Sequence, residues 1–320
     1  MEIGKEEKLL LALLNEGLRV KEPVESKTLS KADGHTLSGI DWDKLENTAR
    51  RHSVLSLLCY PCLGTEEIPE KFRTSVQKEA RGIVLQNYHL LLAGRDMVEL
   101  LAESGIPTAV LKGAAAARSY PEPELRKAGD IDLLVAPECL EEACKVLERL
   151  GCRAAQWQPA LHHVALWTAD GIEAEVHTML AEPFDNEQMN LYLKRKLPEC
   201  LEHMSRRQVM GVELPMLDYG HHAYELLLHM LQHFLRSGFG LRFLCDWVVL
   251  WREDIPEAEQ KRYLGLVRES RLKGFSDMVT AACRDYLGLE ESRISWMELP
   301  ARISAKEFIQ EVLEAEEFGK

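Results

Sequence analysis

Apolar side chains recur at helical spacing through the N-terminal third of the chain. One such segment covers 9–18, and Asp41 stands where the N-cap of a second helix would lie. A third segment covers 69–101 with at most one break, whereas the polar stretch 22–38 is typical of a loop. We therefore predict that the region 1–104 is helical.

The apolar pattern then changes to that of a β-strand. The first strand is expected over 106–111 and ends in Lys112-Gly113, a short helix follows over 114–120, and a second strand covers 130–135. A glycine turn followed at once by a helix points backbone N–H groups and the positive end of the helix dipole toward the turn. A phosphate group would fit at this turn.

One helix and three further strands follow before the chain becomes mainly helical again. The helix is predicted over 137–151, and the strands over 152–157, 163–168 and 172–180. Asp170-Gly171 is typical of a tight hairpin turn between the last two strands. In the helical remainder we expect one short hairpin, centred on Gly211.

The order of these elements predicts an α+β fold in which a small mixed sheet is flanked by two helical regions. We expect an N-terminal helical region over 1–104, a sheet-bearing domain over 105–184 and a C-terminal, mainly helical region over 185–320.

Composition narrows the possible partners and the cellular compartment. The chain has 320 residues, 46% of them hydrophobic, so it can bury a sizeable core. Its net charge of −13 opposes binding to a long nucleic acid. The N-terminus lacks a signal-peptide pattern and the apolar run 9–14 is too short to span a bilayer, so we expect a cytoplasmic protein without a membrane partner. Cys59-x-x-Cys62 has no second pair nearby, which favours two thiols over a zinc site.

Candidate chemistry lies on the second and last strands of the sheet-bearing domain. Alternate side chains of a strand share a face, so Asp130 and Asp132 point to the same side. Such a pair can be a solvated surface feature, but its position after Lys112-Gly113 and before an apolar run favours a divalent metal site. Glu173 and Glu175 share a face of the last strand, and either could supply a third carboxylate.

Together these motifs resemble the uncharacterised bacterial nucleotidyltransferases of the polymerase-β-type nucleotidyltransferase superfamily. The resemblance is carried by Leu111-Lys112-Gly113, Arg126, the run from Gly129 through Asp130 and Asp132 to Val135, Glu175-Val176-His177 and the segment from Gly240 to Asp246. It implies a palm domain that binds an NTP together with Mg²⁺, with Mn²⁺ as an alternative.

The resemblance also assigns roles to individual residues. Asp130, Asp132 and Glu175 would be the catalytic residues and metal ligands, with Glu175 preferred over Glu173 because its register matches the motif. The nucleotide phosphates would contact Lys112, Gly113, Ala114 and Arg126. The superfamily commonly has serine where this chain has Ala114, so a hydroxyl that would help hold a phosphate is absent.

The sequence is compatible with two roles for several residues. Lys112 could cap the turn instead of binding a triphosphate, and His177 is either a core histidine or an accessory site residue. His229 and His233 are spaced for metal binding on a helix, but without a third ligand nearby packing is favoured. Arg242 and Asp246 fit an ordinary helix salt bridge as well as a substrate contact.

The function expected from the sequence is metal-dependent transfer of a nucleoside monophosphate from an NTP to a hydroxyl acceptor, with release of pyrophosphate. The acceptor would be a small molecule or a protein. The alternatives are an antibiotic- or sugar-modifying adenylyltransferase, a toxin-like enzyme that modifies RNA, and a non-catalytic nucleotide-binding or interaction scaffold that retains the palm fold.

Overall fold

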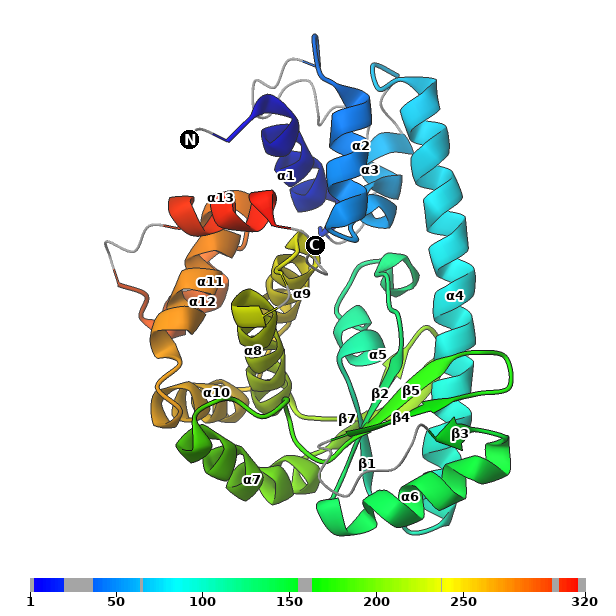
Figure 1. The fold of residues 1–320 in the computed structure, drawn as a ribbon. Coiled ribbons are helices and arrows are strands. Elements are labelled where there is room, and N and C mark those ends of the chain that lie inside the picture. The colour runs from blue at the N-terminus through cyan, green and yellow to red at the C-terminus, as the bar shows by residue number, and fades with distance from the viewer. Residues whose placement is uncertain are drawn as a thin grey trace.

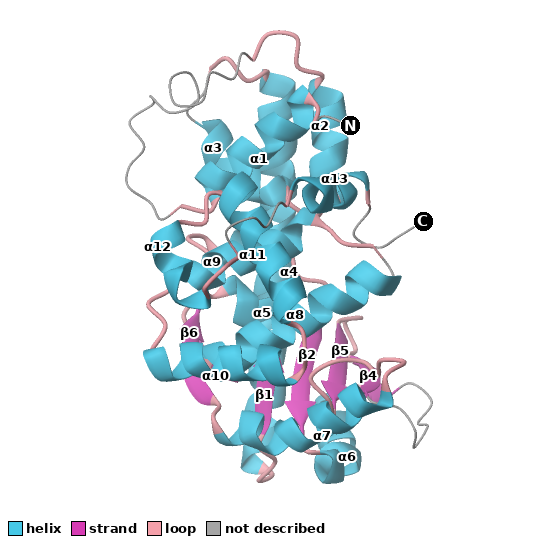
Figure 2. Cartoon of the chain, turned by 90° about the vertical axis from the view of Figure 1, so that its left-hand side faces the viewer, coloured by secondary structure: helices cyan, strands magenta, loops and turns pink. Residues whose placement is uncertain are grey.

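The computed structural model describes residues 3–19, 37–63, 66–154, 163–236, 238–300 and 305–315. Most of the helices gather at one end of the molecule and the sheet lies at the other (Figures 1 and 2). Within the described residues, no helix combines the length and the apolar character needed to cross a membrane.

The N-terminal region is helical, as predicted. Its helices are α1 (Lys5–Gly17), α2 (Trp42–Arg51), α3 (Cys59–Leu63) and α4 (Glu70–Glu103), with a 3-10 turn over Leu55–Leu58. The carboxylate of Asp41 accepts a hydrogen bond from the backbone N–H of Lys44, so Asp41 caps α2. The break that the sequence allowed within 69–101 does not occur, and residues 22–36 of the expected loop lie outside the described residues.

In the part of the chain that the structure describes, the predicted mixed sheet has seven strands in the order β3-β4-β5-β2-β1-β7-β6. Their bounds are β1 Thr108–Leu111, β2 Ile131–Val135, β3 Arg153–Ala154, β4 His163–Trp167, β5 Glu173–His177, β6 Ser205–Val209 and β7 Val212–Met216. β2 pairs antiparallel with β1 and parallel with β5. Of the predicted strand 152–157, residues 155–157 lie outside the described residues.

Both expected hairpins are present. β4 and β5 pair antiparallel across the Asp170-Gly171 turn. The turn between β6 and β7 places Met210 at φ 46° and Gly211 at φ 81°, the left-handed pair that a two-residue hairpin requires. β7 then pairs with β1, so the sheet includes strands beyond the predicted limit 105–184. The three-region division of the chain stays a prediction.

Helices also connect the strands and follow the sheet in the sequence. The remaining helices are α5 Lys112–Ala117, α6 Leu140–Leu147, α7 Glu187–Glu202, α8 Tyr219–Arg236, α9 Leu241–Arg252, α10 Glu257–Glu269, α11 Lys273–Leu287, α12 Glu291–Ile294 and α13 Lys306–Glu314. The helix predicted over 137–151 is α6 with one 3-10 turn on each side, and it ends at Gly151 in the left-handed conformation.

Two hydrophobic clusters form the core, and α4 belongs to both. Phe72, Val76 and Ala80 pack with the helical regions, whereas Leu90 and Met97, among others on α4, pack with the sheet and α6. α4 therefore runs from the N-terminal helices down the side of the sheet (Figure 1).

β2 is buried on both faces. Ile131, Leu133 and Val135 point into the cluster between the sheet, α4 and α6, and Leu134 packs into the helical cluster on the opposite face. Asp132 shares the face of Leu134 and is 1% exposed. A carboxylate at such a position requires charged or hydrogen-bonding partners.

Candidate active site

The chain turns sharply where β1 passes into α5. Lys112 adopts a left-handed conformation at φ 39°, which is unusual for a residue with a side chain. Its ammonium nitrogen lies 2.6 Å from Oδ1 of Asp132 on the neighbouring strand. The turn thus directs a half-buried positive charge at the D-x-D motif.

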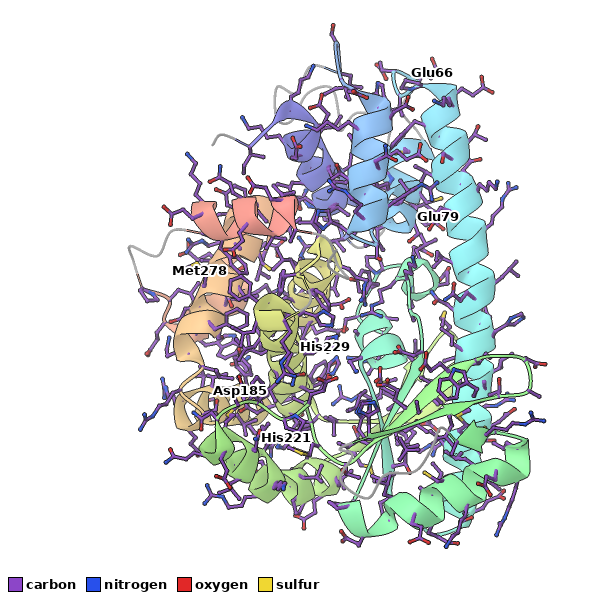
Figure 3. All side chains as sticks on the ribbon, viewed as in Figure 1. Glu66, Glu79, Asp185, His221, His229 and Met278 are labelled. Atoms are coloured by element: carbon purple, nitrogen blue, oxygen red, sulfur yellow. The ribbon has the colours of Figure 1, made fainter. Side chains whose placement is uncertain are left out.

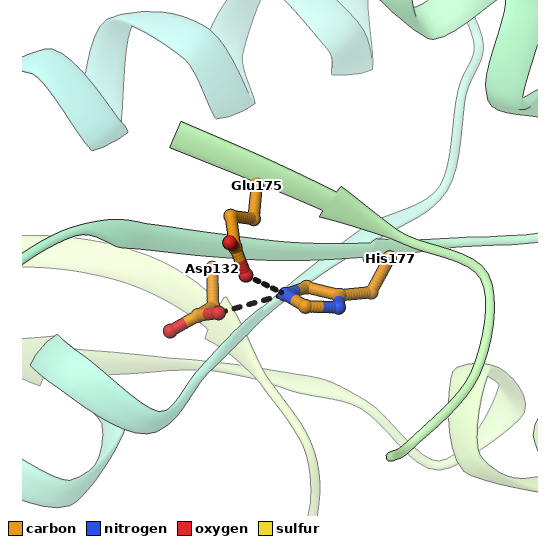
Figure 4. A group of neighbouring side chains, drawn as sticks. All are labelled: Asp132, Glu175 and His177. Atoms are coloured by element: carbon orange, nitrogen blue, oxygen red, sulfur yellow. Dashed lines mark hydrogen bonds and ion pairs between the residues drawn. The ribbon is translucent and has the colours of Figure 1, made fainter. Parts of the chain in front are cut away.

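Asp132 has a second positive or hydrogen-bonding partner in His177, at the end of β5. Nε2 of His177 lies 2.7 Å from Oδ1 of Asp132 and 3.2 Å from Oε2 of Glu175 (Figure 4). Burial alone would raise the pKa of Asp132, but Lys112 and His177 hold it well below its ordinary value. Asp132 is therefore an anion in the folded protein at neutral pH.

Glu175 lies beside Asp132 because of the register between β5 and β2. The two residues are partners in the parallel ladder, so their side chains project from the same face. Glu173 lies two residues earlier on β5, opposite Trp167 of β4. A hydrogen bond from His177 lowers the pKa of Glu175.

Asp130 immediately precedes β2 and completes a set of three carboxylates. It lines the same cavity as Lys112, Glu175 and His177, but it does not belong to the cluster of possible metal-ligand atoms formed by Asp132, Glu175 and His177. Burial and the charge of Asp132 raise the pKa of Asp130 to about 6. The two aspartates of the motif thus differ in their affinity for protons.

The donor atoms present fit a divalent metal. One ligand atom each from Asp132, Glu175 and His177 lies within 4.8 Å of the other two. Carboxylate oxygens are the ligands that Mg²⁺ prefers, and an imidazole also suits Mn²⁺. His177, predicted only as an accessory residue, belongs to this cluster; its spacing of two residues from Glu175 on one strand was the signal for it.

Arg126 lies in a buried ion pair that spans 120 residues of sequence. Its Nε and Nη2 donate to the two carboxylate oxygens of Asp246 at 3.0 and 2.7 Å, and the hydroxyl of Tyr120 donates to Oδ1 at 2.7 Å. The spacing on α9 left a helix salt bridge between Arg242 and Asp246 and a substrate contact as alternatives. In the structure both oxygens of Asp246 accept hydrogen bonds from Arg126, and the charge of Arg242 also lowers the pKa of Asp246.

The same Arg126 also borders a small cavity with Gly113, Ala114 and Asp130. Its predicted contact with a nucleotide phosphate stays a prediction, because the guanidinium fork is engaged by Asp246 in this conformation. In the structure, the pair joins the loop before β2 to α9.

A polar cavity of about 230 Å³ adjoins the carboxylates. One wall is formed by the palm residues Lys112, Asp130, Glu175 and His177, and the opposite wall by α8. Figure 3 shows His229 of α8 beside this region. Burial holds the pKa of His229 well below its ordinary value, and the charge of Lys112 adds to this effect.

His229 and His233 do pack, as the sequence favoured, but they also line the cavity. Their ring centroids are 4.5 Å apart, and both rings contact Phe243. Glu225, one helical turn before His229, lines the cavity as well and was missed in the sequence. Its spacing of four residues from His229 was the available signal.

A family model described as "uncharacterised nucleotidyltransferase" matches residues 38–288. The chain belongs to this nucleotidyltransferase family. The resemblance read from Lys112-Gly113 and Asp130-Ile131-Asp132 is thereby confirmed at the level of the family. A search of curated proteins finds no match.

Two solved structures are similar to this nucleotidyltransferase at low identity. The antibiotic-resistance factor ANT(2'')-Ia is 12% identical with a TM-score of 0.41, and the match covers 59% of this chain and 98% of that one. An antigenic nucleotidyltransferase-like protein from Paracoccidioides brasiliensis is 15% identical with a TM-score of 0.37, with coverage of 63% and 93%.

Proposed function

We propose that the protein transfers a nucleoside monophosphate from an NTP to a hydroxyl acceptor and releases pyrophosphate. The observation that carries this proposal is the placement of Glu175 beside Asp132 in the parallel ladder, facing Lys112, in a chain of the nucleotidyltransferase family. Phosphoryl transfer depends mainly on positioning and on neutralising charge at the phosphate oxygens.

The bonds that change are few. The acceptor oxygen attacks the α-phosphorus, the bond between this phosphorus and the oxygen bridging to the β-phosphate breaks, and pyrophosphate leaves. Glu175 takes the proton of the acceptor hydroxyl, because it lines the cavity and its lowered pKa keeps it ionised and able to accept a proton. Its neighbour His177 positions it by hydrogen bonding.

Asp130, Asp132 and Glu175, with His177 at their side, would hold the divalent metal. When bound, Mg²⁺ or Mn²⁺ would neutralise charge on the phosphate oxygens and lower the pKa of the attacking hydroxyl. Lys112 supplies a fixed positive charge at the same point, so it is suited to contact the β- or γ-phosphate once its bond to Asp132 is exchanged. Gly113 and Ala114 offer only backbone groups.

Ala114 favours one second candidate, a palm that binds nucleotide without transferring it. Without a hydroxyl at this position, the phosphates are held by backbone N–H groups and by the nearby cations Lys112 and Arg126. Such a scaffold would bind NTP and yield no pyrophosphate.

Calorimetric titration with ATP, CTP, GTP and UTP, with and without Mg²⁺, tests the proposal. At least one NTP should bind in a Mg²⁺-dependent manner, and Asp132→Asn should weaken that binding by at least about tenfold. Asp96→Asn, on the exposed side of α4, is the matched control. If no NTP binds with metal dependence, the transfer function is excluded; if one binds but no pyrophosphate is ever released, the scaffold is the better description.

A further inference from the structure

The side of α8 that faces the palm is polar, although α8 is largely buried. Glu225, His229, Gln232, His233 and Arg236 line the cavity, at intervals of four, three, one and three residues. This is the spacing of one helix face. The residues between them, such as Leu226, Leu227, Leu228 and Met230, pack into the helical core.

Glu225 is the member of this polar face that most requires a partner. It is 1% exposed, and among the described residues its Oε2 has no hydrogen-bond donor. Nδ1 of His222 lies 3.6 Å from this oxygen, and the carboxylate helps to raise the pKa of Lys112 across the cavity. A buried carboxylate oxygen without a donor is costly, and such groups are rare in native proteins.

The other charged groups of the cavity have partners of their own. Lys112 is bound to Asp132, and Arg236 donates to the Glu182 carboxylate at 3.0 Å and to the carbonyl of Pro183 at 2.7 Å. Gln232 donates through Nε2 to the carbonyl of Glu182. Glu225 therefore remains available to accept a hydrogen bond from a molecule in the cavity.

The size and position of the cavity limit what that molecule can be. Its volume of about 230 Å³ is below the roughly 300–1,000 Å³ of pockets for drug-sized ligands. The cavity also contains Glu175, which takes the acceptor's proton in the proposed reaction. A molecule of monosaccharide size would reach both Glu175 and the polar face of α8.

We propose that this cavity is the acceptor site and that the acceptor is a small polar molecule. It presents one hydroxyl to Glu175 and a second hydrogen-bond donor, a hydroxyl or an ammonium group, to Glu225. This inference rests on the proposed transfer function and adds the size, polarity and position of the acceptor. Glu225 binds the acceptor, whereas the NTP phosphates lie on the Lys112 side.

The test uses the full chain, α-labelled NTPs and Mg²⁺, with a cell extract separated into a low-molecular-mass filtrate and a macromolecular retentate. The labelled product should form with the filtrate. Glu225→Gln should lower its yield about tenfold, because glutamine can still accept a hydrogen bond but lacks the charge that strengthens it. Ala181→Trp, which fills the cavity from its wall, should abolish the product.

Calorimetric NTP affinity is measured in parallel and should change less than about twofold in both variants, which also shows that they are folded. Glu103→Gln and Ala258→Trp, at exposed helix positions, are the matched controls and should retain the yield.

NMR then measures which of D-glucose, D-glucosamine and ethanolamine bind to the chain when each is added in place of the filtrate. This comparison distinguishes a hydroxyl donor from an ammonium donor. Binding of the amines alone assigns an ammonium to Glu225, and binding of glucose as well assigns a hydroxyl.

Two outcomes overturn the acceptor proposal: a chain that labels only protein or RNA in the retentate, and a Glu225→Gln variant with unchanged yield. A wild-type chain that binds no NTP, or that binds NTP and labels neither fraction, is a different result, because it refutes the transfer function itself.

Discussion

The ammonium group of Lys112 and the carboxylate of Asp132 form an ion pair of 2.6 Å between the end of β1 and the middle of β2. Asp132 is almost completely buried, and a divalent metal would bind the same carboxylate. The positive charge of Lys112 therefore balances Asp132 in the metal-free protein.

Replacing Lys112 by methionine leaves a buried carboxylate with His177 as its remaining partner. We expect Lys112→Met to lower the free energy of unfolding by about 3 kcal/mol without metal, because breaking a buried ion pair leaves one charge uncompensated. Addition of Mg²⁺ should restore part of this loss. Urea denaturation with and without Mg²⁺ measures both effects; Lys71→Met, at the surface, is the control. Equal stability of both variants would contradict the assigned role of the pair.

Substitution of the two glutamates of β5 should reduce pyrophosphate release to very different extents. Glu175→Gln removes a carboxylate beside Asp132, whereas Glu173→Gln changes a residue opposite Trp167. We expect pyrophosphate release to fall at least about a hundredfold in the first variant and less than about threefold in the second. The comparison is made by measuring pyrophosphate at saturating NTP. A larger loss from Glu173→Gln would place the third carboxylate at the other position.

His177 should influence which metal binds. An imidazole nitrogen favours Mn²⁺ over Mg²⁺ more than carboxylates do, because Mg²⁺ prefers oxygen ligands. We expect His177→Asn to reduce the ratio of Mn²⁺ to Mg²⁺ affinity by several-fold, as measured by calorimetry in the absence of nucleotide. His89→Asn, on the exposed surface of α4, is the control. An unchanged ratio would mean that His177 orients the carboxylates without ligating the metal.

The Arg126–Asp246 pair should give the protein a stability that depends on pH. Burial alone would raise the pKa of Asp246, but Arg126 holds it below its ordinary value of 3.8. The stabilisation is therefore present above that ordinary value and is lost as the pH falls through the lower folded-state pKa. Asp246→Asn should destabilise the protein by about 3–5 kcal/mol at pH 7. Between pH 5 and pH 2, this variant should lose less of its free energy of unfolding than the wild type does.

Denaturation at a series of pH values measures this difference. The double variant Asp246→Asn with Arg126→Met should recover part of the stability, because no buried charge is then left unpaired. If wild type and Asp246→Asn lose stability in parallel as the pH falls, the pair does not cause the acid sensitivity.

The local pattern of the sequence was sufficient for most elements of the fold. The Asp41 cap, the Asp170-Gly171 turn and the strands around Asp132 depend on near neighbours in the chain, and the structure has each of them. The family was recognisable for the same reason, because its motifs are short. The α+β class followed from the order of these elements.

Contacts between distant residues could not be predicted in this way. Arg126 and Asp246 are 120 positions apart, and the sequence around each residue does not indicate that the other is its partner. The same holds for Glu225, whose polarity on a mostly apolar helix is conspicuous only once α8 is known to face the palm. The register between β2 and β5 decides whether Glu175 or Glu173 lies beside Asp132. The sequence does not contain this register, so the choice of Glu175 depended on the resemblance to the family motif.

The single helix α4 has a consequence for how the molecule unfolds. Its 34 residues extend roughly 50 Å and are anchored in one hydrophobic cluster at the N-terminal end and in the other at the C-terminal end. If either cluster melts, α4 loses part of its packing, and this destabilises the other cluster as well. We therefore expect both clusters to denature in one cooperative transition. A helix break at Leu85, an exposed position between the two anchors, would uncouple them into two calorimetric peaks.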